Sequence, residues 1–232
     1  MKKHTLQFGS LDIEYELSYQ DRKTLGITVH PDRRVSVTAP LGASDAKIHE
    51  KLRKRAPWIL KQQNFFLSFE PRTPPRRYVG GESHLYLGKQ YRLRFVDSPD
   101  ETVKLLGGYF EIRTTDRSRA EALLDVWYRE RAHARFPVYA APLVEHFSAY
   151  QVKPSELVIR KMEKRWGSCT PKGKIILNVE LIKAPPGCIE YVIVHELCHL
   201  VHHNHSRAFF DLQDKVFPTW RRWKRELERV MV

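Results

Sequence analysis

The feature that most constrains this chain is a short motif in its last third, where a glutamate and two histidines follow an apolar run. Residues 191–194 are apolar and lead directly into His195-Glu196-Leu197-Cys198-His199. The apolar lead-in predicts a buried helix, and two residues four positions apart on a helix lie on the same face, one turn from each other. Both imidazoles can therefore bind one cation, and the rest of the chain is expected to build the wall opposite them.

Several histidines further along could supply a third ligand. His205 follows His199 after a plausible turn, and Ser206 can cap the next helix, which would hold His205 at a defined corner. His202 and His203 lie at or just beyond the expected end of the first helix, where folding back to the metal ion is difficult. Among the histidines, the sequence favours His205.

A glutamate from the end of the chain is the alternative third ligand, as in thermolysin-type enzymes. The candidates are Glu226 and Glu228, which lie in a segment rich in arginine and lysine. Opposite charges three or four positions apart on a helix form ion pairs, and such pairs explain both glutamates without a metal. We therefore predict that the metal ligands are His195, His199 and His205.

The residue types in this motif indicate a catalytic zinc site. Neutral imidazoles leave a fourth position for water, whereas a structural zinc site usually closes its shell with thiolates. Glu196 lies one step around the helix from His195, where its carboxylate can accept a proton from water without binding the metal. Cys198 points about 100° away from His199, so a buried and inert thiol is expected there. We predict a Zn²⁺-dependent hydrolase with Glu196 as general base.

Upstream of the motif, sequence patterns predict a β-rich part with one long helix inserted. Apolar and polar residues alternate over residues 6–40, including a hairpin over 25–39. Helical spacing follows over residues 44–69, where Pro57 predicts a kink or a division into two helices. Four short strands punctuated by glycines are expected at residues 83–87, 89–97, 102–106 and 109–113.

The remainder of the chain is predicted to hold the active-site helix and a small antiparallel sheet. A helix is expected over residues 118–150, divided or kinked at Pro137 and Pro142. Two paired strands are expected at residues 157–162 and 174–179. The fold class is therefore α+β, with a β-rich N-terminal domain over residues 1–115 and a second domain over residues 116–232.

The net charge and the cysteine content indicate which binding partners and which cellular compartment to expect. The formal net charge of +13 favours anionic partners such as nucleic acid, nucleotides or acidic peptides, although a solvated basic surface explains it equally well. The three cysteines have no paired spacing, which argues against a disulfide framework. No apolar stretch suits a signal peptide or a membrane span, so we expect a cytoplasmic protein that does not enter a membrane.

Several motifs in the last third of the chain resemble the YgjP-like metal-dependent hydrolase family, which is related to the SprT-like and WLM zincin proteases. These motifs are Arg165-Trp166-Gly167-Ser168-Cys169, Gly173, Leu177-Asn178, Tyr191-Val192, His195-Glu196-Leu197-Cys198-His199 and Asn204-His205-Ser206. The segment 86–91 is similar to the weaker, β-rich half of the family. The resemblance implies a zincin core, with His195, His199 and His205 on zinc and Glu196 as the base.

The resemblance leaves the substrate open, because family members are described mostly as metallopeptidases and in some cases as nucleoside triphosphate (UTP) pyrophosphatases. Peptide hydrolysis needs an edge strand to hold an extended substrate, and residues 174–179 are the candidate. Phosphoanhydride hydrolysis needs cations, and those near the motif are Arg160, Lys161, Lys164, Arg165, Lys172 and Lys174. We rank the peptide or protein substrate first and the nucleotide second. A non-catalytic nucleic-acid- or protein-binding module with structural zinc ranks third, since it has no need of Glu196.

Three further residues are candidates for substrate binding. For Arg165 and Trp166, contact with substrate and packing of a structural loop under the helix are equally open interpretations. Asn178 is expected to fix the sheet beside the site rather than to take part in the chemistry.

Overall fold

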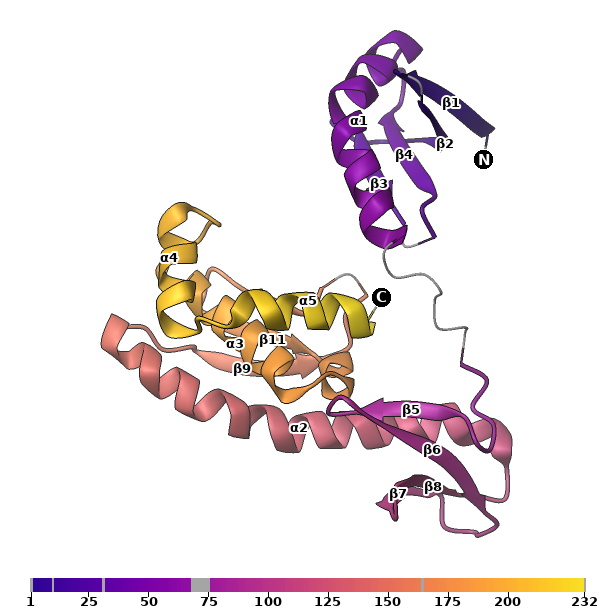
Figure 1. Ribbon diagram of the computed structural model, residues 1–232, viewed down its shortest axis with the longest axis vertical. Helices are drawn as coiled ribbons and strands as arrows, with labels where there is room; N and C mark the ends of the chain where they lie inside the picture. The colour runs from indigo at the N-terminus through magenta and orange to yellow at the C-terminus, as the bar shows by residue number, and fades with distance from the viewer. Residues whose placement is uncertain (1, 10, 31, 68–75, 164, 232) are drawn as a thin grey trace. The chain divides into compact units, whose positions relative to one another are not determined.

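The computed structural model describes residues 2–9, 11–30, 32–67, 76–163 and 165–231. The chain divides into two compact units, residues 1–74 and residues 75–231. The described part contains three sheets and five α-helices, so the fold is mixed α/β (Figure 1). Both the β-rich N-terminal part and the long helix within it are confirmed.

The first unit is one sheet with one helix against it. Alternate side chains of the sheet, such as Ile13 and Val37, are buried with Ile48 and Leu52 of the helix, which explains the two-residue period of the sequence. The helix runs through Pro57 without ending, and the predicted end at Phe69 lies outside the described residues. The elements are β1 (Lys2–Phe8), β2 (Leu11–Gln20), β3 (Gly26–Val29), β4 (Val35–Pro40) and α1 (Asp45–Leu67), with strand order β1-β2-β4-β3. β3 and β4 pair antiparallel as the predicted hairpin.

The second unit begins with a four-stranded sheet and a long helix. The strands agree with the prediction to within one residue at each end. The helix is continuous through Pro137 and Pro142, and both prolines lie at exposed positions, where water can bind the carbonyls that they leave unpaired. The elements are β5 (Ser83–Tyr86), β6 (Lys89–Val96), β7 (Thr102–Leu106), β8 (Tyr109–Arg113) and α2 (Ala120–Phe147), with strand order β5-β6-β8-β7.

This sheet and α2 share one hydrophobic core. The ring of Trp127 on α2 lies 4.9 Å from that of Tyr86 and 5.0 Å from that of Phe110, measured between ring centroids. Because these aromatic side chains bury one another, β5 to β8 belong to the same unit as the C-terminal helices. The division of the chain after residue 74 therefore differs from the predicted one after residue 115.

The third sheet differs from the prediction in two ways. It consists of β9 (Glu156–Arg160), β10 (Gly167–Cys169) and β11 (Lys174–Asn178), in the order β10-β11-β9. The prediction of an antiparallel sheet is wrong, because β11 runs parallel to β9 and antiparallel to β10. The prediction that residues 174–179 form the edge is also wrong, because β10 pairs with β11 on its second side. A strand of Gly-Ser-Cys carries no alternating apolar pattern, so the sequence did not reveal it.

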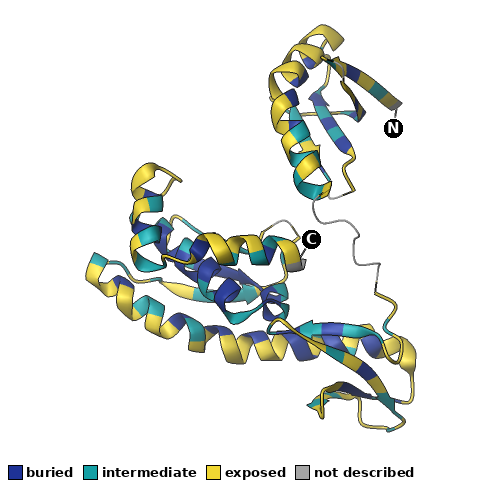
Figure 2. Ribbon diagram, in the orientation of Figure 1, coloured by how far each residue is buried: buried dark blue, intermediate teal, exposed yellow. Residues whose placement is uncertain are grey.

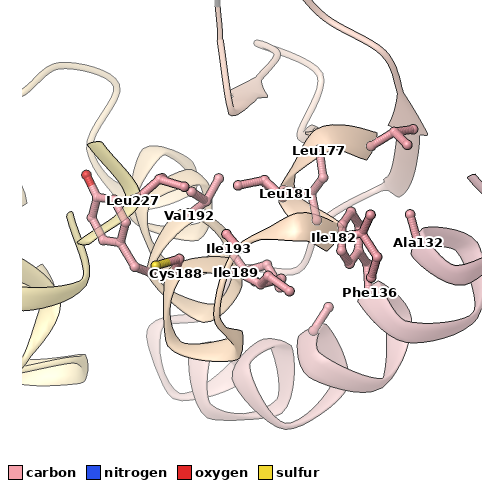
Figure 3. Packing of buried hydrophobic residues seen from close by; sticks show 14 of the residues in the cluster. Ala132, Phe136, Leu177, Leu181, Ile182, Cys188, Ile189, Val192, Ile193 and Leu227 are labelled. Carbon is pink, nitrogen blue, oxygen red and sulfur yellow. The ribbon is translucent and has the colours of Figure 1, made fainter. Parts of the chain in front are cut away.

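Three helices complete the second unit: α3 (Pro186–Val201), α4 (Arg207–Val216) and α5 (Trp220–Met231). No residue of α3 is exposed, and Figure 2 shows this helix within the buried centre of the unit. In Figure 3, Ile189 and Ile193 of α3 lie in one cluster with Ile182 and with Phe136 of α2. The helix that carries the His-Glu-x-x-His motif is thus held rigidly by the core. Within the described ranges, no helix is long and apolar enough to cross a membrane.

Candidate metal centre

Three histidines from two neighbouring segments converge at the end of α3. His195 and His199 lie one turn apart on the helix, and His205 comes from the loop between α3 and α4. One potential ligand atom from each of them lies within 4.8 Å of the others. The Nε2 atoms of His195 and His205 are 3.0 Å apart. Three ring nitrogens at this spacing can surround a single cation.

The loop that carries His205 is fixed by the start of α4. α3 ends at Val201, and His202 has an extended backbone that turns the chain away. The Ser206 side chain then accepts a hydrogen bond from the backbone N–H of Phe209 at 3.4 Å, so it caps α4 as predicted. The cap places His205 immediately before the first turn of α4.

Phe209 forms an apolar floor beneath the three imidazoles. Its side chain is fully buried, and its ring centroid lies 5.0 Å from that of His195, 4.7 Å from that of His199 and 4.8 Å from that of His205. Close-packed rings restrict the imidazoles to a narrow range of orientations. Phe209 was not predicted from the sequence, although its position in the first turn after the Ser206 cap could have indicated it.

The outward-facing nitrogens of the two helical histidines have hydrogen-bond acceptors. The Nδ1 atom of His195 lies 3.1 Å from Oε1 of Gln213, and Nδ1 of His199 lies 3.3 Å from the carbonyl oxygen of His202. An acceptor at Nδ1 keeps the proton there and leaves the Nε2 lone pair free for a metal ion. These residues therefore fit a divalent metal ion, because both the ligands and their orienting partners are present.

Gln213 was also missed in the sequence. Its side chain is fully buried, and its Nε2 atom has no hydrogen-bond partner in the described part of the chain. A buried amide donor without a partner costs about 1–3 kcal/mol. In the sequence, Gln213 follows Phe209 by four positions, so both residues lie on the same face of α4. A polar residue at this spacing could have indicated a role beside the imidazoles.

Burial sets the protonation of the groups in this centre. The pKa of His195 is lowered to about 4, first by its burial and then by the neighbouring His199. Burial also lowers the pKa of His199. Both imidazoles are therefore neutral near neutral pH, which is the form that binds metal ions.

Glu196 points from α3 toward β10. Its pKa is raised to about 7, mainly by burial, against the opposing effects of a hydrogen bond from the backbone N–H of Cys169 and of the positive charge of Arg165. A Cβ atom at Gly167 would lie 2.6 Å from Oε1 of Glu196 and 2.8 Å from its Cγ. Only glycine at this position lets β10 approach the carboxylate so closely.

A hollow of about 580 Å³ opens in front of the three histidines. One side is formed by the segment around β10 and the other by α3 and the loop after it. The lining residues are Arg165, Gly167, Ser168, Cys169, Thr170, Pro171, His195, Glu196, His199, His203 and His205.

β10 is the outer strand of its sheet, and in the described part of the chain no strand pairs with its second edge. The carbonyl of Trp166 accepts from Asn178 N–H, and Thr170 N–H donates to the carbonyl of Lys174, both at 2.9 Å. In an antiparallel pair, alternate residues hydrogen-bond to the partner strand, so Gly167 and Cys169 present their backbone groups on the opposite side. Cys169 N–H binds Glu196 there. The N–H and C=O of Gly167 and the C=O of Cys169 therefore point away from β11.

The predicted substrate-binding residues have different surroundings. Asn178 is buried and donates through Nδ2 to the carbonyls of Met162 (2.8 Å) and Arg165 (2.9 Å), so it holds the loop that leads into β10. Arg165 lines the metal hollow. Trp166 is half-buried and lines a second, smaller hollow.

Most of the other predicted cations do not line the metal hollow. Lys161 pairs with Asp125 at 3.3 Å, and Lys174 pairs with Glu156 at 2.6 Å. Arg160 and Lys172 are absent from its lining, and Lys164 lies outside the described residues.

The two late glutamates have basic partners on their own helix. Glu226 pairs with Arg229 at 2.8 Å, and Glu228 pairs with Lys224 at 3.8 Å. Both pairs are the intrahelical ion pairs that the sequence predicts, so neither glutamate needs a metal to explain its position.

Comparison with known proteins assigns the chain to a family. The matching family model is described as YgjP-like, metallopeptidase domain, and it covers residues 23–230. No curated protein matches the chain. The family implies a divalent metal ion and metal-dependent hydrolysis, and the three histidines provide a place for that ion. The chain belongs to the YgjP-like metallopeptidase family.

Proposed function

We propose that this protein is a zinc-dependent peptidase with a zincin-like catalytic arrangement. The observation that carries the proposal is the convergence of three histidines beside a buried glutamate, opposite the outer strand of a sheet. Each part has a separate role: the histidines bind the metal ion, Glu196 moves a proton, and β10 holds the substrate.

His195, His199 and His205 would hold the zinc ion, because neutral imidazoles suit zinc and leave a position open for catalysis. Bound there, zinc supplies Lewis acidity to the scissile carbonyl and lowers the pKa of water. Cys198 is not a fourth ligand in this proposal, because it is fully buried and burial raises the pKa of its thiol to about 12. A thiol must lose its proton to bind a metal ion.

The substrate would bind as an extended strand against β10. The N–H and C=O of Gly167 offer one donor and one acceptor at this edge, and a peptide that pairs with them would lie along the outer side of β10, in the metal hollow. Its scissile carbonyl then faces the histidines. Backbone pairing of this kind accepts many sequences and fixes the direction of the chain.

Glu196 would act as general base and then as general acid. Its carboxylate accepts a proton from the attacking water and delivers it to the leaving amine. A pKa near 7 suits both steps, because the group must gain and lose a proton at working pH. The hydrogen bond from Cys169 N–H holds the carboxylate in place during the exchange.

Two other functions have less support. A nucleoside triphosphate pyrophosphatase needs several cations around the phosphates, and of the five predicted cations that the structure describes, only Arg165 lines the metal hollow. A binding module with structural zinc explains neither the buried Glu196 nor the open hollow beside the histidines.

Metal analysis together with a substrate screen tests the proposal. Purified protein is expected to hold one zinc ion per chain, and Glu196→Gln should keep this ion while losing hydrolysis of unfolded protein substrates. Nucleoside triphosphates are screened in parallel with both proteins. The peptidase assignment would be overturned if the wild type released pyrophosphate but cleaved no protein, and if Glu196→Gln abolished the pyrophosphate release.

A further inference from the structure

A second hollow adjoins the metal centre. It has a volume of about 200 Å³ and is lined by Trp166, Gly167, Tyr191, Val192, His195 and Glu196. The last two of these residues and Gly167 also line the metal hollow. A group in the small hollow therefore lies directly beside the base and one of the histidines.

The walls of the small hollow are apolar and held in place. Tyr191 is nearly buried, and its ring stacks on that of Trp220 with a centroid distance of 6.1 Å and an interplanar angle of 11°. Val192 is 4% exposed, and Trp166 packs against the hydrophobic core. These three side chains give the hollow a fixed shape before any substrate binds.

The chemistry of the lining favours an apolar occupant. Its ionisable side chains are Glu196, His195 and the phenol of Tyr191, and the first two belong to the catalytic centre. An anionic group would be repelled by the Glu196 carboxylate, and a cationic group would find no carboxylate in this lining apart from Glu196, which the proposed reaction already uses. An apolar group instead buries its surface against Trp166, Tyr191 and Val192.

The volume of the small hollow limits the size of the occupant. Pockets for whole small-molecule ligands measure roughly 300–1,000 Å³, so a hollow of about 200 Å³ suits a single side chain. The metal hollow, at about 580 Å³, falls within the range for a longer segment of substrate.

We propose that the small hollow is a specificity pocket for the residue next to the scissile bond, and that it selects peptides with an aliphatic or aromatic side chain there. This inference rests on the proposed peptidase function. The position next to the bond follows because Glu196 and His195 line both hollows, so the occupant is within one residue of the attacked carbonyl.

Cleavage of a peptide mixture tests the inference. The zinc-loaded full chain is incubated with peptides of mixed sequence, and the new termini are identified by mass spectrometry. Leu, Phe, Met and Val are expected to be enriched at one of the two positions that flank the cleaved bond. For peptides that differ only at this residue, kcat/KM should be roughly tenfold higher with Leu than with Gly or Asp.

Substitutions of residues that line the small hollow test whether it causes this preference. Trp166→Ala enlarges the pocket and should shift the preference toward larger side chains, and Val192→Ala should do the same if Trp166→Ala does not fold. Trp58→Ala is the matched control, because Trp58 is an exposed tryptophan of the first unit. Binding of the same peptides to Glu196→Gln should show the same order of affinities without turnover.

The outcomes separate the two proposals. Cleavage with no apolar enrichment at either flanking position, or with an enrichment unchanged in both wall variants, would overturn the specificity pocket and leave the peptidase function standing. Absence of any cleavage by the zinc-loaded chain would remove both.

Discussion

The Nδ1 atom of His195 lies 3.1 Å from Oε1 of Gln213, a side chain that is fully buried on α4. This contact joins the two segments that build the metal centre, since α4 begins just after His205. The same helix supplies Phe209 under the imidazoles, so one short helix positions the third histidine, the floor and the orienting acceptor.

Gln213→Met is expected to weaken zinc binding by about 10–100-fold, because Met has a similar length but no acceptor to hold the His195 Nδ1 proton. Gln213→Glu restores an acceptor and should bind zinc far more tightly than Gln213→Met. Competition with a chromophoric chelator measures the affinity, and thermal unfolding of the metal-free variants checks the fold. A Gln213→Met protein with the affinity of the wild type would contradict an orienting role.

Gly167→Ala is expected to lower hydrolytic activity by at least about 100-fold while zinc stays bound. The added Cβ would lie 2.6 Å from Oε1 of Glu196, so either β10 or the carboxylate must move. We expect a loss of about 1–3 kcal/mol in the free energy of unfolding.

Gly80→Ala is the matched control for Gly167→Ala, because the nearest atom to its added Cβ is 3.8 Å away. Steady-state kinetics and denaturant unfolding measure both effects. If Gly167→Ala were as active as Gly80→Ala, close approach of β10 to Glu196 would not be needed.

His205→Ala should lose stoichiometric zinc, because only two imidazoles then remain at the centre. His203→Ala, which alters a neighbouring histidine of the same loop outside the triad, should retain it. Elemental analysis after dialysis against a weak chelator distinguishes the two variants. Equal zinc content in both would show that His205 is not a ligand.

Arg165→Met is expected to move the acid limb of the kcat/KM profile to higher pH. Glu196 must be charged to accept a proton, so activity falls as the pH drops through its pKa. Burial raises this pKa to about 7 and Arg165 lowers it, so removing the guanidinium raises it further. Lys161→Met, whose ammonium pairs with Asp125 away from the hollow, is the control and should leave the limb unchanged. An identical limb in both variants would argue against this electrostatic role of Arg165.

Much of the metal centre was predictable because its rules are local. His195 and His199 share a face through the helical repeat, and the Ser206 cap sets the corner beside His205. The intrahelical ion pairs of Glu226 and Glu228 follow from the same short-range geometry. Long, strongly periodic elements such as α1 and α2 were predictable for this reason as well.

The errors concern pairings between distant segments. β11 was predicted to be the edge strand that holds an extended substrate, yet β10 occupies that edge through backbone hydrogen bonds that no side-chain pattern reports. The division into compact units after residue 74 also depends on distant contacts, since the packing of Phe110 on Trp127 leaves no trace in composition.

By itself, the sequence determined which residues can bind a metal ion and which carboxylate stands beside them, because a helix fixes the relative positions of residues a few places apart. Only the tertiary structure decided that β10 forms the wall, that Gly167 must lack a side chain, and that Gln213 orients His195. Each of these depends on the distance between residues far apart in the chain, and that distance is set by how the whole unit packs around α3.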